Sequence, residues 1–489
     1  MLNCLMIIFI FLPIFSSAQT DSLVLKEQLQ EDFLVYRKSL EEAHPGLYWY
    51  RSKFEMDSIF DEAYKKLDQS MTEKQFFTLL SSVTAKIGCL HTVIRVCKAF
   101  EKAEINPEAK TFPFEIKLDK NRLFIYQNLS NDTTISEGTE IMAVNGKTAS
   151  YLVPFFVDKI SNDGFGDHWS RYALETSFRY YLHIFFGEST SFQLTFKDDK
   201  GNKRTTSVPS RSEKERFKIL QKRYPHSAEP EHVISLKFHE ETKSAILKIT
   251  RFDNWKIKGK KYKFRKVLKK KMNELVASNV SNLILDVGDR GGGNELWGLD
   301  LLSYFLKEPY KAYKAVEFKT LDYSISKKYS NTSWFEYNLL KLLLNFERSD
   351  STWNWKNYRG LKPYTPKKNG FHGNIYLLVS GATASATSDF AAWVDELKLV
   401  TIVGTETGGS YLGNTSNWEF TVELPNTQLR LLLPLARYLT NVEERALGRG
   451  IIPNHIVPST IQDKLGNVDT QLNYVLNIIK KKQVEKMKR

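Results

Sequence analysis

Residues 374–410 limit the possible folds of this chain more than any other stretch. They read NIYLLVSGATASATSDFAAWVDELKLVTIVGTETGGS. The pattern predicts a buried strand at 375–379, a turn of small residues, a helix at about 386–397 and a second buried strand at 400–403. Two buried strands joined by a helix are typical of a core in which strands and helices alternate.

Ser385 lies at the turn between the first of these strands and the helix. A serine at a strand-to-helix turn can present its hydroxyl group as a nucleophile. The first N–H groups of the helix, and the positive end of its dipole, could stabilise a developing oxyanion. Serine is also a common helix cap, so the local pattern favours the two interpretations about equally.

The first residues of the chain have the pattern of a secretory signal peptide. Residues 1–18 are mostly apolar and end in Ser16-Ser17-Ala18, which predicts cleavage before Gln19. This run is short for a membrane span, and no later stretch is long enough for one. We therefore expect a periplasmic or secreted protein that is not transmembrane after signal cleavage.

The formal net charge of +14 is partly concentrated at residues 256–271, KIKGKKYKFRKVLKKK. Such a run could contact nucleic acid. The solvated face of an amphipathic helix, with Phe264, Leu268 and Met272 turned inward, is the favoured interpretation. We expect no nucleic-acid partner, and an anionic envelope surface is the alternative.

Residues 19–100 form a predicted N-terminal helical region. Thr72-Glu-Lys-Gln75 is a capping box before an apolar stripe of helical spacing, and Gly88 ends that helix. His91 follows, between the helix and a strand at 93–96. Its position alone favours a structural role, and His44 has a weaker claim to function. Cys89 and Cys97 fit either one disulfide or two separate thiols.

The next segments predict a β-rich domain, a linker and a core. Residues 112–209 are rich in strand patterns, with a helical insertion, and the stretch GTEIMAVNG at 138–146 resembles the strand and Asn-Gly turn of a PDZ domain. The polar residues 210–243 are interpreted as a linker. Residues 244–480 alternate strands and helices, which predicts a mostly parallel or mixed sheet, and 481–489 form a basic tail. The aromatic segment 309–371 interrupts the core as a lid, a substrate wall or a packed helical insertion.

A glycine-rich loop follows another predicted strand of the core. Residues 282–294 read NLILDVGDRGGGN. Glycines at this point let backbone N–H groups approach a ligand closely, as an oxyanion hole requires. The alternative is a tight strand-to-helix turn without a ligand, and the spacing does not fit a dinucleotide-binding motif.

These motifs, taken in order, closely resemble the tail-specific (C-terminal processing) serine peptidase family. The resemblance rests on the strand and glycine loop at 282–294, the turn Thr383-Ala-Ser-Ala386, the segment 404–410 and the element GRGIIPN at 448–454. It covers most of residues 75–480. It implies an α/β (α+β) fold with a mixed-sheet core of crotonase-like βα units, an N-terminal helical region and a PDZ-like domain. No metal or organic cofactor is expected.

The resemblance assigns a role to several residues. Ser385 would be the nucleophile, and Gly291, Gly292 and Ala386 would supply oxyanion-binding N–H groups. Many members of the family use a lysine base 25 residues after the serine, but position 410 of this chain is serine. The chain therefore resembles the tricorn-core-like branch, which uses a histidine followed by threonine, as in Cys89-Leu-His91-Thr92.

His91 would then be the general base, because a neutral imidazole can take the hydroxyl proton and return it to the leaving amine. The carboxylate that orients it could be Glu443, Glu444 or Glu406, and we name Glu444 as the third catalytic residue. The expected function is an exported serine endopeptidase that acts on a peptide or protein. The alternative is a weak or inactive protein that binds a peptide or ligand on the same fold.

Overall fold

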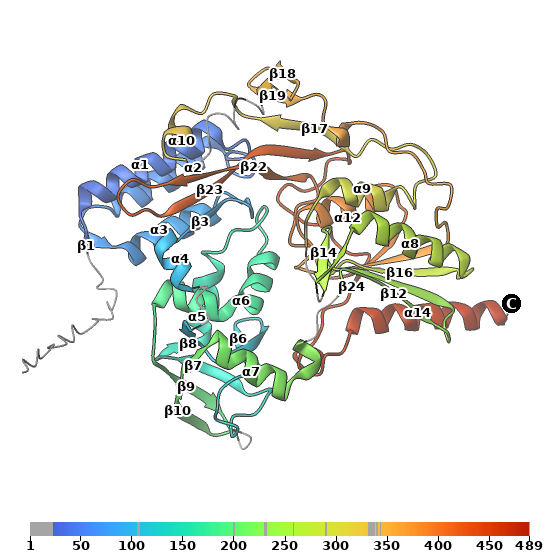
Figure 1. The fold of residues 1–489 in the computed structure, drawn as a ribbon, viewed down its shortest axis with the longest axis horizontal. Helices are drawn as coiled ribbons and strands as arrows, with labels where there is room; N and C mark the ends of the chain where they lie inside the picture. Colours follow the sequence, from blue (N-terminus) through green and yellow to red (C-terminus); the bar gives the residue numbers. More distant parts are fainter. Residues whose placement is uncertain are drawn as a thin grey trace, which may run out of the picture.

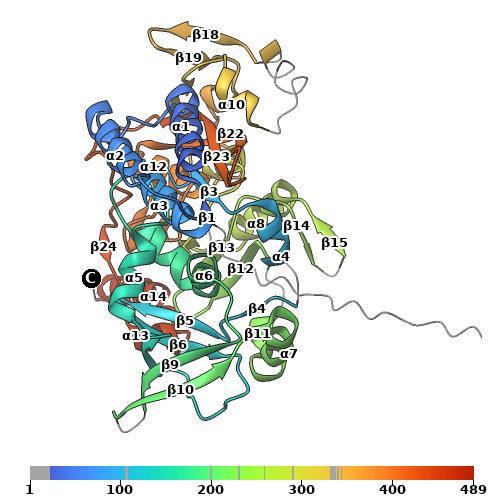
Figure 2. The same ribbon diagram turned by 90° about the vertical axis from the view of Figure 1, so that its left-hand side faces the viewer.

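The computed structural model describes residues 23–488 except 105–107, 199–200, 229–231, 258, 289–290, 331–337, 339–340 and 343. The predicted signal peptide lies outside this range. Figures 1 and 2 show three regions: the N-terminal helices, a lower sheet with its own helices, and a larger α/β core. The mixed α/β fold that the sequence predicts is confirmed.

The described part of the N-terminal region consists of four helices with short strands. Its elements are β1 (Leu23–Val24), α1 (Lys26–Ala43), α2 (Lys53–Lys65), β2 (Met71–Thr72), α3 (Glu73–Ala85), β3 (Val93–Arg95) and α4 (Lys98–Glu104). The capping box predicted before α3 is confirmed: the Thr72 hydroxyl accepts from Gln75 N–H, and the Gln75 side chain accepts from Thr72 N–H. Helix α3, whose end precedes His91, therefore begins at a defined residue.

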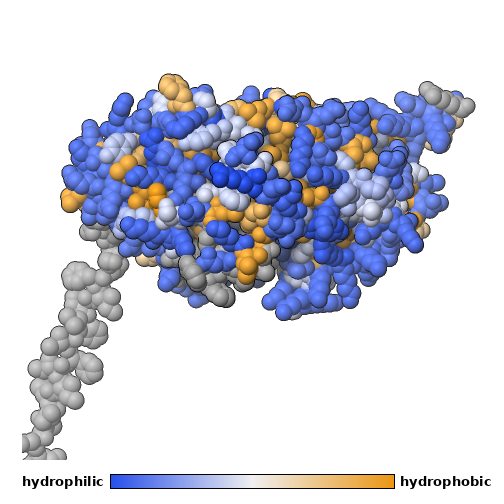
Figure 3. Space-filling model, turned by 90° about the horizontal axis from the view of Figure 1, so that it is seen from above, coloured by the Kyte–Doolittle hydropathy of each residue, from blue (hydrophilic) through white to orange (hydrophobic). Residues whose placement is uncertain are grey.

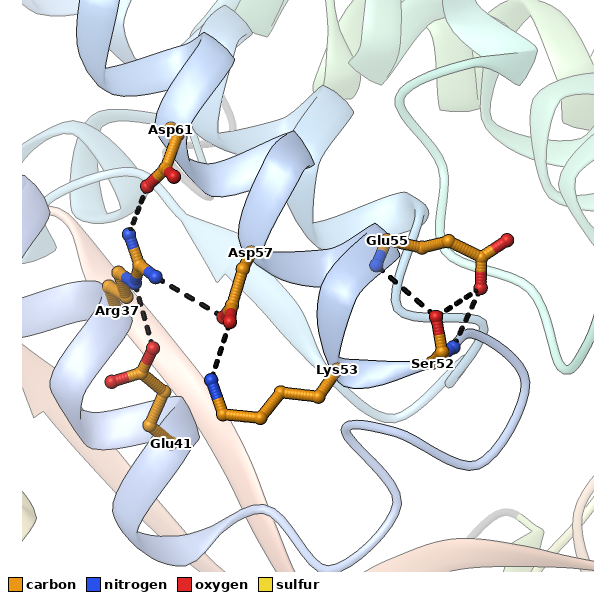
Figure 4. Close-up of polar contacts among 7 residues, drawn as sticks. All are labelled: Arg37, Glu41, Ser52, Lys53, Glu55, Asp57 and Asp61. Atoms are coloured by element: carbon orange, nitrogen blue, oxygen red, sulfur yellow. Dashed lines mark hydrogen bonds and ion pairs between the residues drawn. The ribbon is translucent and has the colours of Figure 1, made fainter.

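Ion pairs join α1 and α2 on the outside of this region. Arg37 of α1 contacts Glu41 on its own helix and Asp57 and Asp61 on α2, as Figure 4 shows. The apolar faces of the same helices are buried, with Phe33, Tyr36 and Phe60 at 0% exposure. Since exposed ion pairs contribute little, the buried aromatic residues provide most of the stability of this contact.

The second region is built on the sheet β10-β9-β7-β6-β5. Its Asn145-Gly146 turn has positive φ angles at both residues and joins β7 to β8, as the sequence predicts. In both ribbon views α5 and α6 lie between this sheet and the N-terminal helices. The elements are β4 (Lys110–Thr111), β5 (Phe114–Asp119), β6 (Arg122–Asn128), β7 (Glu140–Val144), β8 (Lys147–Thr148), α5 (Ala149–Val157), α6 (His168–Phe186), β9 (Ser191–Lys197) and β10 (Lys203–Pro209).

The prediction of a linker at 210–243 is wrong, because the described residues of this segment form regular secondary structure. They contain β11 (Arg211–Ser212), α7 (Glu213–Arg223), η1 (Pro225–Ala228) and β12 (Ile234–His239). Helix α7 begins with a capping box at Ser212 and Glu215 and buries only Arg216. A helix with so little apolar surface has no amphipathic signal in the sequence, and β12 is the edge strand of the core sheet.

The core sheet has the order β12-β13-β16-β20-β21-β24, in which only β12 is antiparallel to its neighbour. Helices α8, α9 and α12 lie on one side of it and α14 on the other (Figure 1). The bounds are β13 (Ser244–Ile249), β14 (Trp255–Ile257), β15 (Lys260–Tyr262), α8 (Phe264–Ala277), β16 (Asn282–Asp286), α9 (Glu295–Leu302), β20 (Asn374–Val379), α12 (Ala386–Glu396), β21 (Thr401–Gly404), β24 (His455–Ile456), α13 (Ile461–Leu465) and α14 (Thr470–Met487). The strands that the sequence placed here are confirmed.

A second sheet crosses the top of the molecule, with the order β18-β19-β17-β23-β22 (Figure 1). Its elements, with the short helices between them, are β17 (Tyr313–Phe318), α10 (Ser324–Lys328), β18 (Phe346–Ser349), β19 (Thr352–Trp355), η2 (Arg359–Leu361), β22 (Gly413–Glu423) and β23 (Arg430–Thr440). The described part of segment 309–371 therefore supplies three strands of a sheet, which differs from the predicted lid or helical insertion. Strand β3 also pairs with β23 and so joins the N-terminal region to this sheet.

The second part of the basic run, from Phe264, lies in the predicted amphipathic helix α8, which buries Phe264, Leu268, Met272 and Leu275. The first part differs from the prediction, because it contributes to the hairpin of β14 and β15. Seen from above, the molecule is mainly hydrophilic, with hydrophobic residues in separate small areas (Figure 3). Within the residues that the structure describes, no helix is both long enough and apolar enough to cross a bilayer.

Candidate active site

Ser385 ends the turn after β20 and lies at the N-cap position of α12, with φ 55° and ψ −137°. A positive φ at a residue other than glycine stores strain and is typical of a serine presented on a sharp strand-to-helix turn. The side chain makes no capping hydrogen bond. The simple cap that the sequence allowed is therefore not the role of this hydroxyl group.

His91 reaches Ser385 from the distant N-terminal region. Its Nε2 lies 3.2 Å from Ser385 Oγ, which is hydrogen-bond distance. Burial lowers the pKa of His91 to about 4, and the Thr415 carbonyl only partly offsets this fall. The imidazole is therefore neutral near pH 7 and can accept a proton from the serine.

The glycine loop packs directly against the nucleophile turn. A Cβ atom at Gly291 would lie 2.5 Å from both Ala382 O and Ala384 N, so only glycine fits there. Gly292 has a φ of +95°, and a Cβ at this position would lie 3.3 Å from Ser385 Cβ. The predicted oxyanion residues thus lie together with the serine.

These donors are not all free. The Gly292 N–H donates to Thr387 Oγ1 at 2.9 Å. The Ala386 N–H is the first of α12, so it has no carbonyl acceptor within the helix. Ala386 is thus the oxyanion donor that the geometry leaves most available.

A small pocket of about 30 Å³ adjoins Ser385 and His91. Sequence reasoning missed two acidic residues in its lining, Glu295 and Asp389. Burial raises the pKa of Asp389 to about 7, and Tyr313 and Asn414 donate hydrogen bonds to its carboxylate. Asp389 lies one helical turn after Ser385 on α12, and this spacing could have indicated it.

The structure does not bring the predicted orienting carboxylates to His91. Glu443 and Glu444 are exposed in the segment after β23. Glu406 instead pairs with Arg449, accepts from Gly450 N–H and lies 3.4 Å from His168. Glu444 therefore does not complete a triad in this arrangement.

The carboxylate near His91 is that of Asp163, in the loop between α5 and α6. One carboxylate oxygen of Asp163, a ring nitrogen of His91 and Cys89 Sγ all lie within 4.8 Å of one another. Asp163 accepts a hydrogen bond from Leu90 N–H at 3.0 Å. Burial raises its pKa to about 7, and the N–H groups of Leu90 and Ser410 oppose this rise. Its sequence neighbours, Asn162 and Gly164, carry no signal for such a role.

The remaining candidates have structural positions. His44 uses both ring nitrogens, since it accepts from Gly46 N–H at 3.0 Å and its Nε2 lies 2.7 Å from Thr92 Oγ1. Cys89 and Cys97 are both free thiols, so the two-thiol alternative is confirmed. Ser410 is buried, and its hydroxyl accepts from Leu412 N–H.

Several solved structures are similar to this chain. The crystal structure of mature CPAF matches 92% of this chain and 98% of its own, with a TM-score of 0.62 and 14% identity. Mature CPAF complexed with lactacystin matches 92% of this chain and 99% of its own at the same TM-score and identity. These two share the fold of this chain. The photosystem II D1 C-terminal processing protease matches 92% of this chain and 97% of its own, with a TM-score of 0.43 and 13% identity.

The family model described as Peptidase family S41 matches residues 243–457. This range begins just before β13 and ends just after β24, so it includes the glycine loop, Ser385 and the hairpin of β22 and β23. His91 and Asp163 lie outside it and reach the site from the two other regions. Residues 243–457 of this chain are therefore similar to the domain that defines Peptidase family S41.

Proposed function

We propose that this protein is an exported serine endopeptidase in which Ser385 is the nucleophile and His91 the general base. The observation that carries the proposal is the 3.2 Å distance between His91 Nε2 and Ser385 Oγ, on a strained turn at a helix N-terminus. The S41 domain supports peptide-bond hydrolysis as the reaction. The signal pattern at 1–18 supports export, and the serine at position 410 supports a mechanism that uses histidine and not lysine.

The reaction follows from the protonation state of His91. Its neutral Nε2 takes the Ser385 proton while Oγ attacks the scissile carbonyl carbon. The Ala386 N–H stabilises the oxyanion, and Gly292 can join it once its N–H exchanges Thr387 Oγ1 for the oxyanion. His91 then protonates the leaving amine, and water hydrolyses the acyl-enzyme by the same steps. Asp163, whose carboxylate lies within 4.8 Å of a His91 ring nitrogen, would favour the tautomer that leaves Nε2 free to accept.

The substrate in this proposal is an extended peptide. A cavity of about 540 Å³ begins beside Leu90, the neighbour of His91, and includes all of β3 in its lining. Trp169, Tyr172 and Tyr180 of α6 also line it. Strand β3 pairs with β23 on one edge, and within the described residues no strand pairs with its other edge. Such an edge, with nearby aromatic side chains, suits a peptide that adds as a strand. The PDZ-like region, which supplies α6, would hold part of this peptide.

The test is covalent labelling with a fluorophosphonate probe, together with cleavage of an unstructured protein. Wild-type protein is expected to label and to cleave, and Ser385→Ala to do neither. The matched control is Ser207→Ala, an exposed serine on β10, which should behave as wild type. Labelling of Ser385→Ala at the wild-type rate would overturn the proposal.

A weakly active or inactive peptide-binding protein is the second candidate. Two observations favour it: the Gly292 N–H is held by Thr387 Oγ1, and the pocket beside Ser385 is only about 30 Å³. The variant His91→Ala separates the two functions. An enzyme should lose turnover and keep its peptide affinity, whereas a binding protein has no turnover to lose.

A further inference from the structure

His91 and two neighbouring side chains form a group of three potential metal ligands. Cys89 Sγ, a His91 ring nitrogen and an Asp163 carboxylate oxygen lie within 4.8 Å of one another. Asp163 Oδ2 is buried without a hydrogen-bond partner among the described residues, and His91 Nδ1 makes no hydrogen bond of regular geometry there, although the Thr415 carbonyl interacts weakly with the ring. Asp163 and Cys89 are only 6% and 3% exposed. Unpaired buried polar atoms are costly, so their meeting at one point indicates a ligand.

We propose that Cys89, His91 and Asp163 bind a zinc ion that inhibits the enzyme. A thiolate, an imidazole and a carboxylate form a donor set that zinc prefers, with the fourth position left for water. The two anionic ligands also neutralise the double charge of the ion. The buried complex is therefore uncharged, which avoids the large penalty of an isolated buried charge.

The cluster needs only a small contraction to bind the ion. Ligand atoms about 2.0–2.3 Å from a tetrahedral zinc ion are roughly 3.3–3.8 Å apart. The separations of up to 4.8 Å would therefore shorten by about 1 Å. Cys89 Sγ, which now donates to the Thr415 carbonyl at 3.3 Å, would lose its proton to solvent and bind the ion as a thiolate.

Inhibition follows from the two nitrogens of one ring, and this step rests on the proposed function. Because Nε2 faces Ser385 Oγ, the nitrogen left for the ion is Nδ1. A neutral imidazole with a metal on Nδ1 carries its proton on Nε2. That nitrogen then donates to Ser385 and cannot accept the serine proton. Zinc release restores the basic tautomer, so the inhibition is reversible.

Metal binding can be measured without any activity assay. One equivalent of Co²⁺ added to the metal-free full-length protein should give a thiolate-to-cobalt charge-transfer band in the near ultraviolet, which added Zn²⁺ removes. Cys89→Ser should lose this band and still be able to donate to the Thr415 carbonyl. The matched control Cys97→Ser should keep it, since Cys97 is the other free thiol among the described residues. No band in wild type, or a band that survives in Cys89→Ser, would overturn the proposal.

A second variant covers the case in which Cys89→Ser does not fold, as judged by circular dichroism. Asp163→Asn keeps the thiolate and removes one anionic ligand. We expect its affinity for Co²⁺ to fall at least tenfold, measured by competition with a coloured chelator. An unchanged affinity would exclude Asp163 from the site.

Inhibition is then measured as the rate of fluorophosphonate labelling with Zn²⁺ or with EDTA. Wild type and Cys97→Ser should label at least tenfold more slowly with saturating zinc, and EDTA should reverse this. Cys89→Ser should label equally in both. A cobalt band without labelling under any condition would retain the metal site and reject the peptidase. The absence of a cobalt band, together with labelling that zinc does not slow, would reject the metal site and retain the peptidase.

Discussion

At the scale of single residues, the backbone of Ser385 distinguishes a nucleophile from a cap. The local sequence fits both roles, because each places a serine before a helix. A capping serine has an extended backbone and accepts an N–H from the first helical turn. Ser385 has φ 55° and makes no such bond. This difference comes from the packing of the glycine loop, which no local pattern contains.

In the proposed oxyanion hole, Thr387 would compete for one of the N–H donors. Its hydroxyl accepts the Gly292 N–H at 2.9 Å, in competition with a substrate oxyanion. The nearly isosteric change Thr387→Val removes this acceptor and should raise the labelling rate, by up to about tenfold if roughly 1.4 kcal/mol of competition is removed. The measurement is labelling by the fluorophosphonate at several probe concentrations. An unchanged rate, with an unchanged urea midpoint, would show that Gly292 takes no part in the hole.

His44 makes stability depend on pH. Burial lowers its pKa to about 3, against an ordinary value of 6.5, so between these pH values the unfolded chain binds more protons than the folded one. The contribution of His44 to the free energy of unfolding is complete above pH 6.5 and falls as the pH decreases towards 3. His44→Asn keeps an acceptor for Gly46 N–H but does not titrate.

The variant should therefore be less stable than wild type at pH 7, and this gap should narrow by about 2 kcal/mol at pH 5. Urea unfolding at the two pH values measures the gap. All other titrating groups are common to both proteins and cancel. A gap that stays constant would show that His44 is not buried in its neutral form.

At the scale of elements, the sequence predicts the strands that are short, uninterrupted apolar runs. Strands β13, β16, β20 and β21 are such runs, and each has a helix before or after it, as in a core that alternates strands and helices. Strands β22 and β23 escaped prediction although they are eleven residues each. A bulge between Ser416 and Glu419 breaks the alternation of β22, and Pro434 interrupts β23 opposite that bulge.

The contact between β3 and β23 determines the position of His91, two residues before β3. Arg430 is 7% exposed and donates from Nε and Nη2 to the Val96 carbonyl, at 3.1 and 3.0 Å, and from Nη2 to Glu101. Arg430→Met keeps the length of the side chain and removes these bonds. We expect a loss of about 2–4 kcal/mol in the free energy of unfolding and slower labelling, because His91 loses its support.

The matched control for Arg430 is Lys98→Met, in helix α4. Lys98 pairs with Glu423 at 2.8 Å, but its side chain is 51% exposed. Solvent screens this pair, so its loss should cost at most about 1 kcal/mol and leave labelling unchanged. Equal effects of the two variants would contradict the role of Arg430.

At the scale of the whole molecule, the site is assembled from three regions. Ser385 comes from the core, His91 from the N-terminal region and Asp163 from a loop of the β-rich region. The resemblance of motifs could indicate Ser385 and His91, because both lie in recognisable local patterns. The sequence indicated Glu444, whereas the structure brings Asp163 close to His91. Local patterns could not predict this carboxylate, because its position depends on how separate regions pack.

One hydrophobic core joins these regions, since Phe33 of α1, Leu182 of α6 and Trp393 of α12 belong to the same buried cluster. We therefore expect the regions to unfold together. Asp32 of α1 reinforces this connection at 0% exposure. Its carboxylate accepts four hydrogen bonds of 2.6–3.0 Å from the loop between β22 and β23. The donors are the backbone N–H and the side chain of both Asn426 and Thr427.

Asp32→Asn replaces one acceptor oxygen with an NH₂ group that faces the donors of this loop. The unpaired donors should lower the free energy of unfolding by about 2–4 kcal/mol. The control is Glu31→Gln, at an exposed neighbouring residue that, among the described residues, accepts from the Asn426 side chain alone. It should change stability by less than about 1 kcal/mol.

Labelling of Ser385 and tryptophan fluorescence, followed across a urea titration, report on the site and on the whole molecule. Both curves of Asp32→Asn should shift to lower urea by the same amount, because His91 can leave Ser385 only when the common core opens. Loss of labelling at a urea concentration where the fluorescence is still native would show that the N-terminal region unfolds by itself.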